Sequence, residues 1–267
     1  LPSGPGSIEG LGESFEPSLH NGTAKYAMAL TVPPGPGGHA PSVTLRYDGG
    51  NGNGTLGFGW RLDVPFVQRQ TDKCIPRYVD APNGRDDDGD RLVDEADELD
   101  VFINDMKEEL VRTREGDYFC ENEDAFIRYR RVDDHWEGTL PTGTVVEFGL
   151  TSSARIADSA TGQVFAWFAE RSTDTHGNII VFRYTAFSGE ADANQVYLSE
   201  IRYGPGVDGG DESAFHFLHF GYEPRPDWFE DGRAGFLIRT GHRLSAITIG
   251  TQGAELNGHA SGDFNND

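Results

Sequence analysis

The sequence predicts an all-β protein made of many short antiparallel strands and hairpins. Short runs alternate between apolar or aromatic and polar residues, which is the period-two pattern of a strand with one buried face. The chain of 267 residues also holds 35 glycines and 14 prolines, spread between these runs where turns are expected. Helical periodicity is weak and confined to residues 94–99. These three observations favour strands joined by turns over a helical fold.

Seven runs carry the strand pattern most clearly. They are residues 26–32, 42–47, 125–132, 144–148, 179–184, 198–203 and 214–220. The Gly- and Pro-rich segments 33–38 and 48–54 are predicted to be turns or loops rather than linkers, because strand-like sequence resumes on both sides. Similar turns at 141–143 and 174–178 each precede an aromatic strand, and this recurrence predicts stacked hairpins.

Composition limits the classes of partner. The formal net charge of −22 disfavours nucleic acids and anionic membrane surfaces, because both repel an acidic protein at long range. No run of 18 apolar residues occurs, so we expect no direct membrane insertion, and the start at Leu1 lacks signal-peptide features and suggests a fragment. Cys74 and Cys120 allow at most one disulfide, and two buried free thiols are the favoured interpretation.

The acidic segment 86–97 has the spacing of a twelve-residue calcium loop. Carboxylates stand at loop positions one, three, five, nine and twelve, and a backbone carbonyl is expected at position seven. The predicted ligands are Asp86, Asp88, Asp90, Asp94, Asp97 and the carbonyl of Leu92. Two residues depart from the pattern, since Arg91 replaces the usual Gly and Asp97 replaces a bidentate Glu, so we expect a weak or partly hydrated Ca²⁺ site.

The alternative for this segment is a solvated acidic surface loop. Residues 80–109 hold 13 acidic and 3 basic side chains, so the negative charge is concentrated there. Mg²⁺ and Mn²⁺ share the preference for oxygen, but the number of ligands and the flexibility of such a loop favour Ca²⁺. Its predicted effect is local, because a cation would neutralise clustered carboxylates and stiffen the loop.

Four stretches occur in a familiar order, namely 1–15, 56–60, 70–78 and 235–240. Together they resemble the N-terminal domain shared by the Salmonella virulence-plasmid protein SpvB and the B components of insecticidal toxin complexes. The resemblance covers nearly the whole chain. Residues 174–203 are also similar to one unit of the tyrosine-aspartate, or Rhs, repeats from which such shells are built.

The resemblance implies a secreted, non-enzymatic structural module. It would form part of an Rhs-like β-shell that encapsulates a toxic cargo or helps to translocate it. The implied partners are other toxin-complex subunits or the Rhs and propeller regions of the same protein. The implied location is extracellular, and cytoplasmic before export. A calcium-dependent surface adhesin or carbohydrate-binding β-module is the alternative, and an exposed cluster of the four Trp residues would favour it.

The resemblance also predicts that the chain consists of two parts. Residues 1–255 would be the β-domain, with an acidic insertion at about 83–100 where the family is expected to run more directly from 76–78 to 100–102. Residues 256–267 resemble the truncated start of an FG-GAP or VCBS-like propeller repeat. The first ligands of that repeat's own calcium loop would be Asp263, Asn265 and Asp267, which we expect to be metal-free in this chain.

Two pairs of residues are candidates for catalysis or metal binding. The pair Glu121 and Glu123 resembles the glutamates of an ADP-ribosyltransferase, but the expected Ser-Thr strand should precede such a pair and Ser172-Thr173 follows it. His216 and His219 are three residues apart on a predicted strand, so their rings point to opposite faces and do not form a metal pair. We therefore predict no catalytic residues and no cofactor other than Ca²⁺.

Overall fold

The computed structural model confirms the all-β prediction. It describes residues 16–17, 24–86, 91, 99–122, 126–189, 192–205, 207 and 215–252. Apart from strands, this part of the chain contains two short 3-10 turns, η1 (Pro36–Gly38) and η2 (Ser152–Ala154). None of its helical segments is long and apolar enough to cross a membrane. Most of the weak helical pattern at 94–99 falls outside the described residues.

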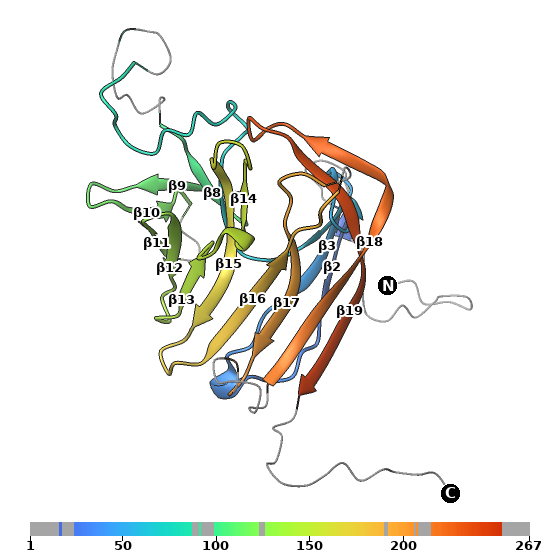
Figure 1. Cartoon of the computed structure of the whole chain (residues 1–267). Coiled ribbons are helices and arrows are strands. Elements are labelled where there is room, and N and C mark those ends of the chain that lie inside the picture. Colours follow the sequence, from blue (N-terminus) through green and yellow to red (C-terminus); the bar gives the residue numbers. More distant parts are fainter. Residues whose placement is uncertain are drawn as a thin grey trace, which may run out of the picture.

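Three sheets make up the fold, and two of them are small. The first has the strand order β1–β2–β3–β6, formed by Glu16–Pro17, Ala24–Ala29, Thr44–Asp48 and Trp60–Leu62. The second is the hairpin of β4 (Asn53–Gly54) and β5 (Gly57–Phe58). Both lie in the first part of the chain, which is blue in Figure 1.

The third sheet has 13 strands, and eight of them close into a ring. Neighbouring strands pair antiparallel from β7 through β13, and β15 closes the ring by pairing with both β7 and β13. The ring strands are β7 (Phe66–Arg69), β8 (Phe102–Asn104), β9 (Glu109–Arg112), β10 (Asp117–Cys120), β11 (Arg128–Val132), β12 (His135–Thr139), β13 (Val145–Phe148) and β15 (Val164–Thr173). A short strand, β14 (Arg155–Ala157), pairs with β15.

From β15 the sheet continues outward as a wall of four antiparallel strands. These are β16 (Ile179–Thr185), β17 (Tyr197–Tyr203), β18 (Phe215–Asp231) and β19 (Ile238–Gln252). Figure 1 shows them side by side, with the long β18–β19 hairpin on the outside. Tyr203 joins the wall to the start of the chain, because its hydroxyl donates to the carbonyl of Pro33 at 2.7 Å.

Aromatic side chains fill the ring. Trp136 and Trp167 are fully buried, and Phe102 packs edge-on against both, with ring centroids 4.8 and 6.0 Å apart. Tyr118 packs against Trp136 at 4.9 Å. The indole N–H of Trp167 is satisfied by the carbonyl of Asp134 at 2.8 Å, as burial requires. The ring is therefore a packed core rather than an open channel.

The two similar turns detected in the sequence lie against each other. Gly143 ends the turn between β12 and β13, and Gly177 lies in the turn between β15 and β16. Both glycines have left-handed backbones, with φ of +83° and +82°. A Cβ on Gly143 would lie 2.6 Å from the Cγ2 of Thr175, so the turns are in close contact. The prediction of stacked hairpins is confirmed.

Candidate functional site: the acidic segment and its buried anchor

The structure describes two positions of the predicted calcium loop. The N–H of Arg91 donates to the Oδ2 of Asp86 at 2.9 Å, and Arg91 has φ of +82°. Position six of such a loop takes a sharp turn that usually requires Gly, and Arg91 adopts this left-handed backbone. The other predicted ligands, Asp88, Asp90, Leu92, Asp94 and Asp97, lie outside the described residues. Metal binding therefore stays a prediction.

The two ends of the acidic segment are hydrogen-bonded to each other. The carboxylate of Asp100 accepts the backbone N–H groups of Arg77 and Tyr78, both at 2.8 Å. In return, the N–H of Asp100 donates to the carbonyl of Val79 at 2.8 Å. This closed base is the arrangement that an inserted loop needs if the strands on either side are to keep their positions.

Arg69 anchors this base to the ring. Its side chain leaves β7 and is 4% exposed, and its guanidinium donates to Asp100 at 2.6 Å and to Asp80 at 3.0 Å. Its Nε donates to the carbonyl of Val164 at 2.9 Å. The guanidinium also lies over the ring of Tyr78, 4.6 Å from its centroid. A buried cation with carboxylate and carbonyl partners fixes the point where the segment leaves the ring.

Tyr78 extends the anchor to the far end of the sheet. Its hydroxyl donates to the carbonyl of Ala234, in the turn between β18 and β19, at 2.6 Å. Burial raises the pKa of Tyr78 to about 12, although the charge of Arg69 opposes this shift and that of Asp100 adds to it. The phenol is therefore protonated at neutral pH and remains a hydrogen-bond donor.

The two histidines of β18 have different partners. The Nδ1 of His216 lies 2.7 Å from the Oγ1 of Thr251, whereas the Nε2 of His219 lies 2.5 Å from the Oε1 of Glu200. The two rings therefore contact side chains of different neighbouring strands, β19 for His216 and β17 for His219. Burial alone would raise the pKa of Glu200, but hydrogen bonds from Arg202 and His219 outweigh it and lower that pKa.

The tryptophans do not form an exposed platform. Trp136 and Trp167 are in the ring core, and Trp60 packs against Tyr47 with centroids 5.4 Å apart. Trp228 is 50% exposed and lies beneath the guanidinium of Arg239, 5.2 Å away. An adhesin or sugar-binding surface built on these side chains is therefore disfavoured.

The two cysteines and the other predicted residues differ in exposure and in whether the structure describes them. Both thiols are free, and Cys120 is buried and accepts the side-chain amide of Asn104 at 3.3 Å. Cys74 is exposed, so the prediction that both thiols are buried is wrong for Cys74, which lies in the surface segment after β7. Glu121 is exposed and described, whereas Glu123 and the predicted ligands Asp263, Asn265 and Asp267 lie outside the described residues.

Solved structures share this fold. The chain matches the crystal structure of TcdB2-TccC3 with 25% identity and a TM-score of 0.72, over 93% of this chain and 14% of that one. A structure of the Photorhabdus luminescens Tc holotoxin pore gives the same values. The N-terminal domain of the effector protein SpvB from Salmonella typhimurium strain LT2 shows the same fold, with 20% identity, a TM-score of 0.63 and coverage of 83% of this chain and 86% of that domain. The chain therefore has the β-rich fold of a domain that occurs in a Tc holotoxin and in the effector protein SpvB.

Sequence comparison identifies the family. The family model described as Salmonella virulence plasmid 65kDa B protein, SpvB, matches residues 18–216, and the chain belongs to this family. The mono(ADP-ribosyl)transferase SpvB of Salmonella choleraesuis (strain SC-B67) is 26% identical over 236 residues, or 78% of this chain. The same protein from Salmonella dublin is 26% identical over 75% of this chain. The chain spans 39% and 38% of the length of these two relatives. The resemblance seen in the sequence is confirmed.

Proposed function

We propose that this chain is a non-enzymatic structural module of a secreted bacterial toxin. It contributes to an Rhs-like β-shell that encapsulates a toxic cargo or helps to translocate it. The observation that carries the proposal is the structural match to TcdB2-TccC3 over 93% of the chain. The continuous sheet supports it, because β16 to β19 extend from the packed ring as a wall.

The enzymatic name of the curated relatives belongs to a much longer protein. This chain spans 39% of the Salmonella choleraesuis relative, so we place any transferase activity outside the region that it represents. Partners in the proposal are adjoining Rhs and propeller regions, with residues 256–267 as the start of the propeller, or other toxin-complex subunits.

The acidic segment is proposed to bind Ca²⁺. The ligands would be the carboxylates of Asp86, Asp88, Asp90, Asp94 and Asp97 and the carbonyl of Leu92. The left-handed turn at Arg91 and its hydrogen bond to Asp86 support this proposal. Because the base is anchored by Arg69, cation binding would stiffen the segment without changing the ring.

Protease protection of the cargo tests the shell. In the full-length toxin, the toxic segment should resist a protease that digests the same segment when it is expressed alone. Deletion of the β18–β19 hairpin, residues 215–252, should make the segment sensitive. The matched control replaces residues 81–98 with a short Gly-Ser linker and should leave protection intact. Equal protection in the wild type and the hairpin deletion would reject the shell proposal.

The isolated chain provides a second test. Incubated with a nicotinamide nucleotide, it should give no hydrolysis above the buffer rate. Hydrolysis that disappears in the Glu123→Ala variant would overturn the non-enzymatic assignment.

A further inference from the structure

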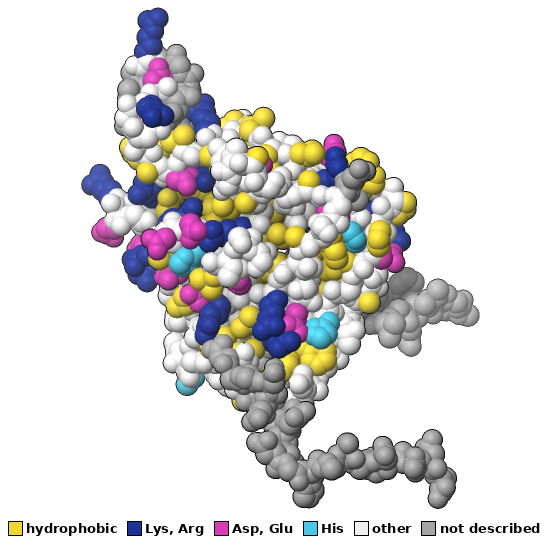
Figure 2. All heavy atoms as spheres, in the orientation of Figure 1, with side chains coloured by type: hydrophobic (Ala, Val, Ile, Leu, Met, Phe, Trp, Pro, Cys, Tyr) yellow, Lys and Arg dark blue, Asp and Glu magenta, His cyan; other side chains and the backbone are white. Residues whose placement is uncertain are grey.

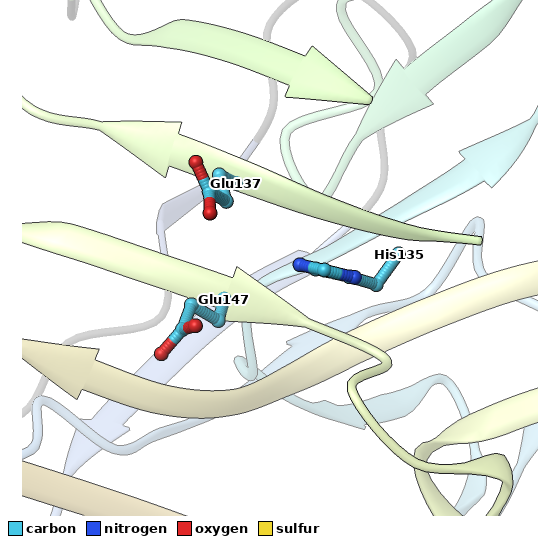
Figure 3. Close-up of side chains that lie close together, drawn as sticks. All are labelled: His135, Glu137 and Glu147. Carbon is cyan, nitrogen blue, oxygen red and sulfur yellow. The ribbon is translucent and has the colours of Figure 1, made fainter. Parts of the chain in front are cut away.

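Three metal-ligating side chains meet on the outside of the ring. His135 and Glu137 occupy alternate positions of β12, and Glu147 of β13 is the cross-strand partner of Glu137. The intervening Trp136 and its cross-strand partner Phe148 are buried, with 0% and 3% exposure. Because successive side chains of a strand point to opposite faces, the His and the two Glu point away from the core. Figure 3 shows the three side chains lying close together.

Their ligand atoms are close enough to share one ion. One nitrogen of His135 and one carboxylate oxygen each of Glu137 and Glu147 all lie within 4.8 Å of one another. Metal–ligand distances of about 2.0–2.2 Å for imidazole nitrogen and carboxylate oxygen place the ligand atoms about 3.5 Å apart around a tetrahedral ion. Small side-chain rotations therefore close the site, and the paired strands hold the three Cα positions in place.

The cluster contains a pair of like charges, Glu137 and Glu147. Two carboxylates directly opposite each other on neighbouring strands repel. Each glutamate also has an arginine on its other side, because Arg130 is the cross-strand partner of Glu137 and Arg171 is that of Glu147. The Nε of Arg130 donates to Asp117 at 2.9 Å, and the Nε of Arg171 lies 3.9 Å from Glu147. The charge of Arg130 acts on Glu137 as well as on Asp117, so it is shared between two carboxylates. A bound cation would remove the remaining repulsion between Glu137 and Glu147.

The surroundings are accessible to an ion from solvent. His135, Glu137 and Glu147 are each partly exposed. Figure 2 shows acidic, basic and histidine side chains gathered over β11 to β13 on the visible face of the molecule. An ion held by three protein ligands there keeps a coordination position for water.

We propose that His135, Glu137 and Glu147 bind a divalent transition-metal ion of the Zn²⁺ class. The imidazole nitrogen distinguishes this site from the acidic segment, whose ligands are all oxygen atoms and suit Ca²⁺. The ion joins β12 to β13 across the charge-repelling pair and so stabilises the ring. This inference is independent of the shell proposal, because it concerns only these three side chains.

Titration of the purified chain with Zn²⁺ by calorimetry tests the site. The wild type should bind one ion in an event that is lost or weakened at least tenfold in both His135→Ala and Glu147→Gln. His176→Ala is the matched control, because this histidine is 81% exposed beside Asp174 and outside the cluster. Titration with Co²⁺ should give a visible absorption band that the same two variants lose. Unchanged Zn²⁺ binding in both variants would overturn the proposal.

Thermal melts separate metal binding from a purely structural role. In chelator, Glu137→Gln should melt close to the wild-type temperature, because the loss of repulsion from Glu147 offsets the loss of attraction to Arg130. Zn²⁺ should raise the melting temperature of the wild type and not that of Glu137→Gln. An equal Zn²⁺-dependent rise in both proteins would show that the ion binds elsewhere and would reject the site.

Discussion

Arg69 and Asp100 form a buried ion pair that joins the ring to the end of the acidic segment. Their Nη1 and Oδ2 atoms are 2.6 Å apart, and the two side chains are only 4% and 5% exposed. Arg69 is held by β7, whereas Asp100 follows the most acidic stretch of the chain. The pair therefore determines where a strongly charged segment leaves a well-packed core. Its removal should destabilise both the ring and the base of the acidic segment.

Replacing Arg69 with Ala should lower the free energy of unfolding by about 3–5 kcal/mol, because it leaves the carboxylate of Asp100 buried without its cation. Urea denaturation followed by Trp fluorescence measures the change. Lys73→Ala is the matched control, because Lys73 is 67% exposed and forms a surface ion pair with Glu109. It should cost less than about 1 kcal/mol. Similar losses of unfolding free energy in Arg69→Ala and Lys73→Ala would contradict the proposed role of Arg69 as an anchor.

Replacing residues 81–98 with a short Gly-Ser linker should preserve the ring. The ends of the segment are already joined by the hydrogen bonds among Arg77, Tyr78, Val79 and Asp100. Near-ultraviolet circular dichroism of the buried Trp136 and Trp167 should match that of the wild type. Loss of this signal would show that the ring depends on the acidic segment.

Calcium should raise the melting temperature of the wild type, and chelator should reverse the rise. Both effects should be absent in the Asp86→Ala, Asp90→Ala double variant, because two carboxylate ligands of the predicted loop are removed. His135→Ala should keep the calcium response, since it alters the separate cluster on β12. A melt that ignores Ca²⁺ and chelator would leave the segment a solvated acidic loop.

Replacing Gly143 with Ala should destabilise the stacked turns. The new methyl group meets the Cγ2 of Thr175 at 2.6 Å in a left-handed backbone, whereas Gly162, with φ of +78°, has no atom within 4 Å of its Cβ position. Gly162→Ala should therefore cost only the backbone strain, about 1–2 kcal/mol. Gly143→Ala should cost about 1–3 kcal/mol more in urea denaturation. Thr175→Ser should recover part of that excess, and no recovery would exclude the turn contact as its cause.

The sequence predicts the strands in which apolar and polar residues alternate regularly, but it does not predict the closure of the ring. The runs at 179–184 and 198–203 became β16 and β17 almost unchanged, because both carry β-branched and aromatic residues that favour strands. β8 and β14 have three residues each, too few for a period of two to be recognised. Ring closure depends on β15 pairing with both β7 and β13, a contact between distant segments that no local pattern encodes.

The side-chain sites also differ in how far the sequence predicts them. The spacing of the predicted calcium loop is local, so the sequence alone suggests it, whereas the Arg69 anchor gathers partners that are 11, 31 and 95 residues away. The cluster on β12 and β13 lies between these two cases, because only part of it could be predicted from the sequence. His135 and Glu137 are adjacent on one face of a strand, but their closeness to Glu147 follows only from the hairpin register.

Arg225 ties the wall to the small β4–β5 hairpin. Its side chain is 1% exposed, and its guanidinium donates to the carbonyl of Gly54 at 2.7 Å and to the side chain of Asn53 at 2.7 Å. The same guanidinium donates to Asp227 at 2.8 Å. This hydrogen bond lowers the pKa of Asp227 to about 2.

Asp227 should therefore make stability depend on pH. A carboxyl group whose pKa is lowered by folding stabilises the native state above its unfolded pKa of about 3.9, and this contribution is lost as the pH falls through the folded value. The urea midpoint of Asp227→Asn should lie below that of the wild type at pH 5, and the two should converge as the pH approaches about 2. Glu115→Gln, which removes one exposed charge in the turn between β9 and β10, is the control. A constant difference between Asp227→Asn and the wild type from pH 5 to pH 2 would show that packing around Arg225, not the charge of Asp227, is responsible.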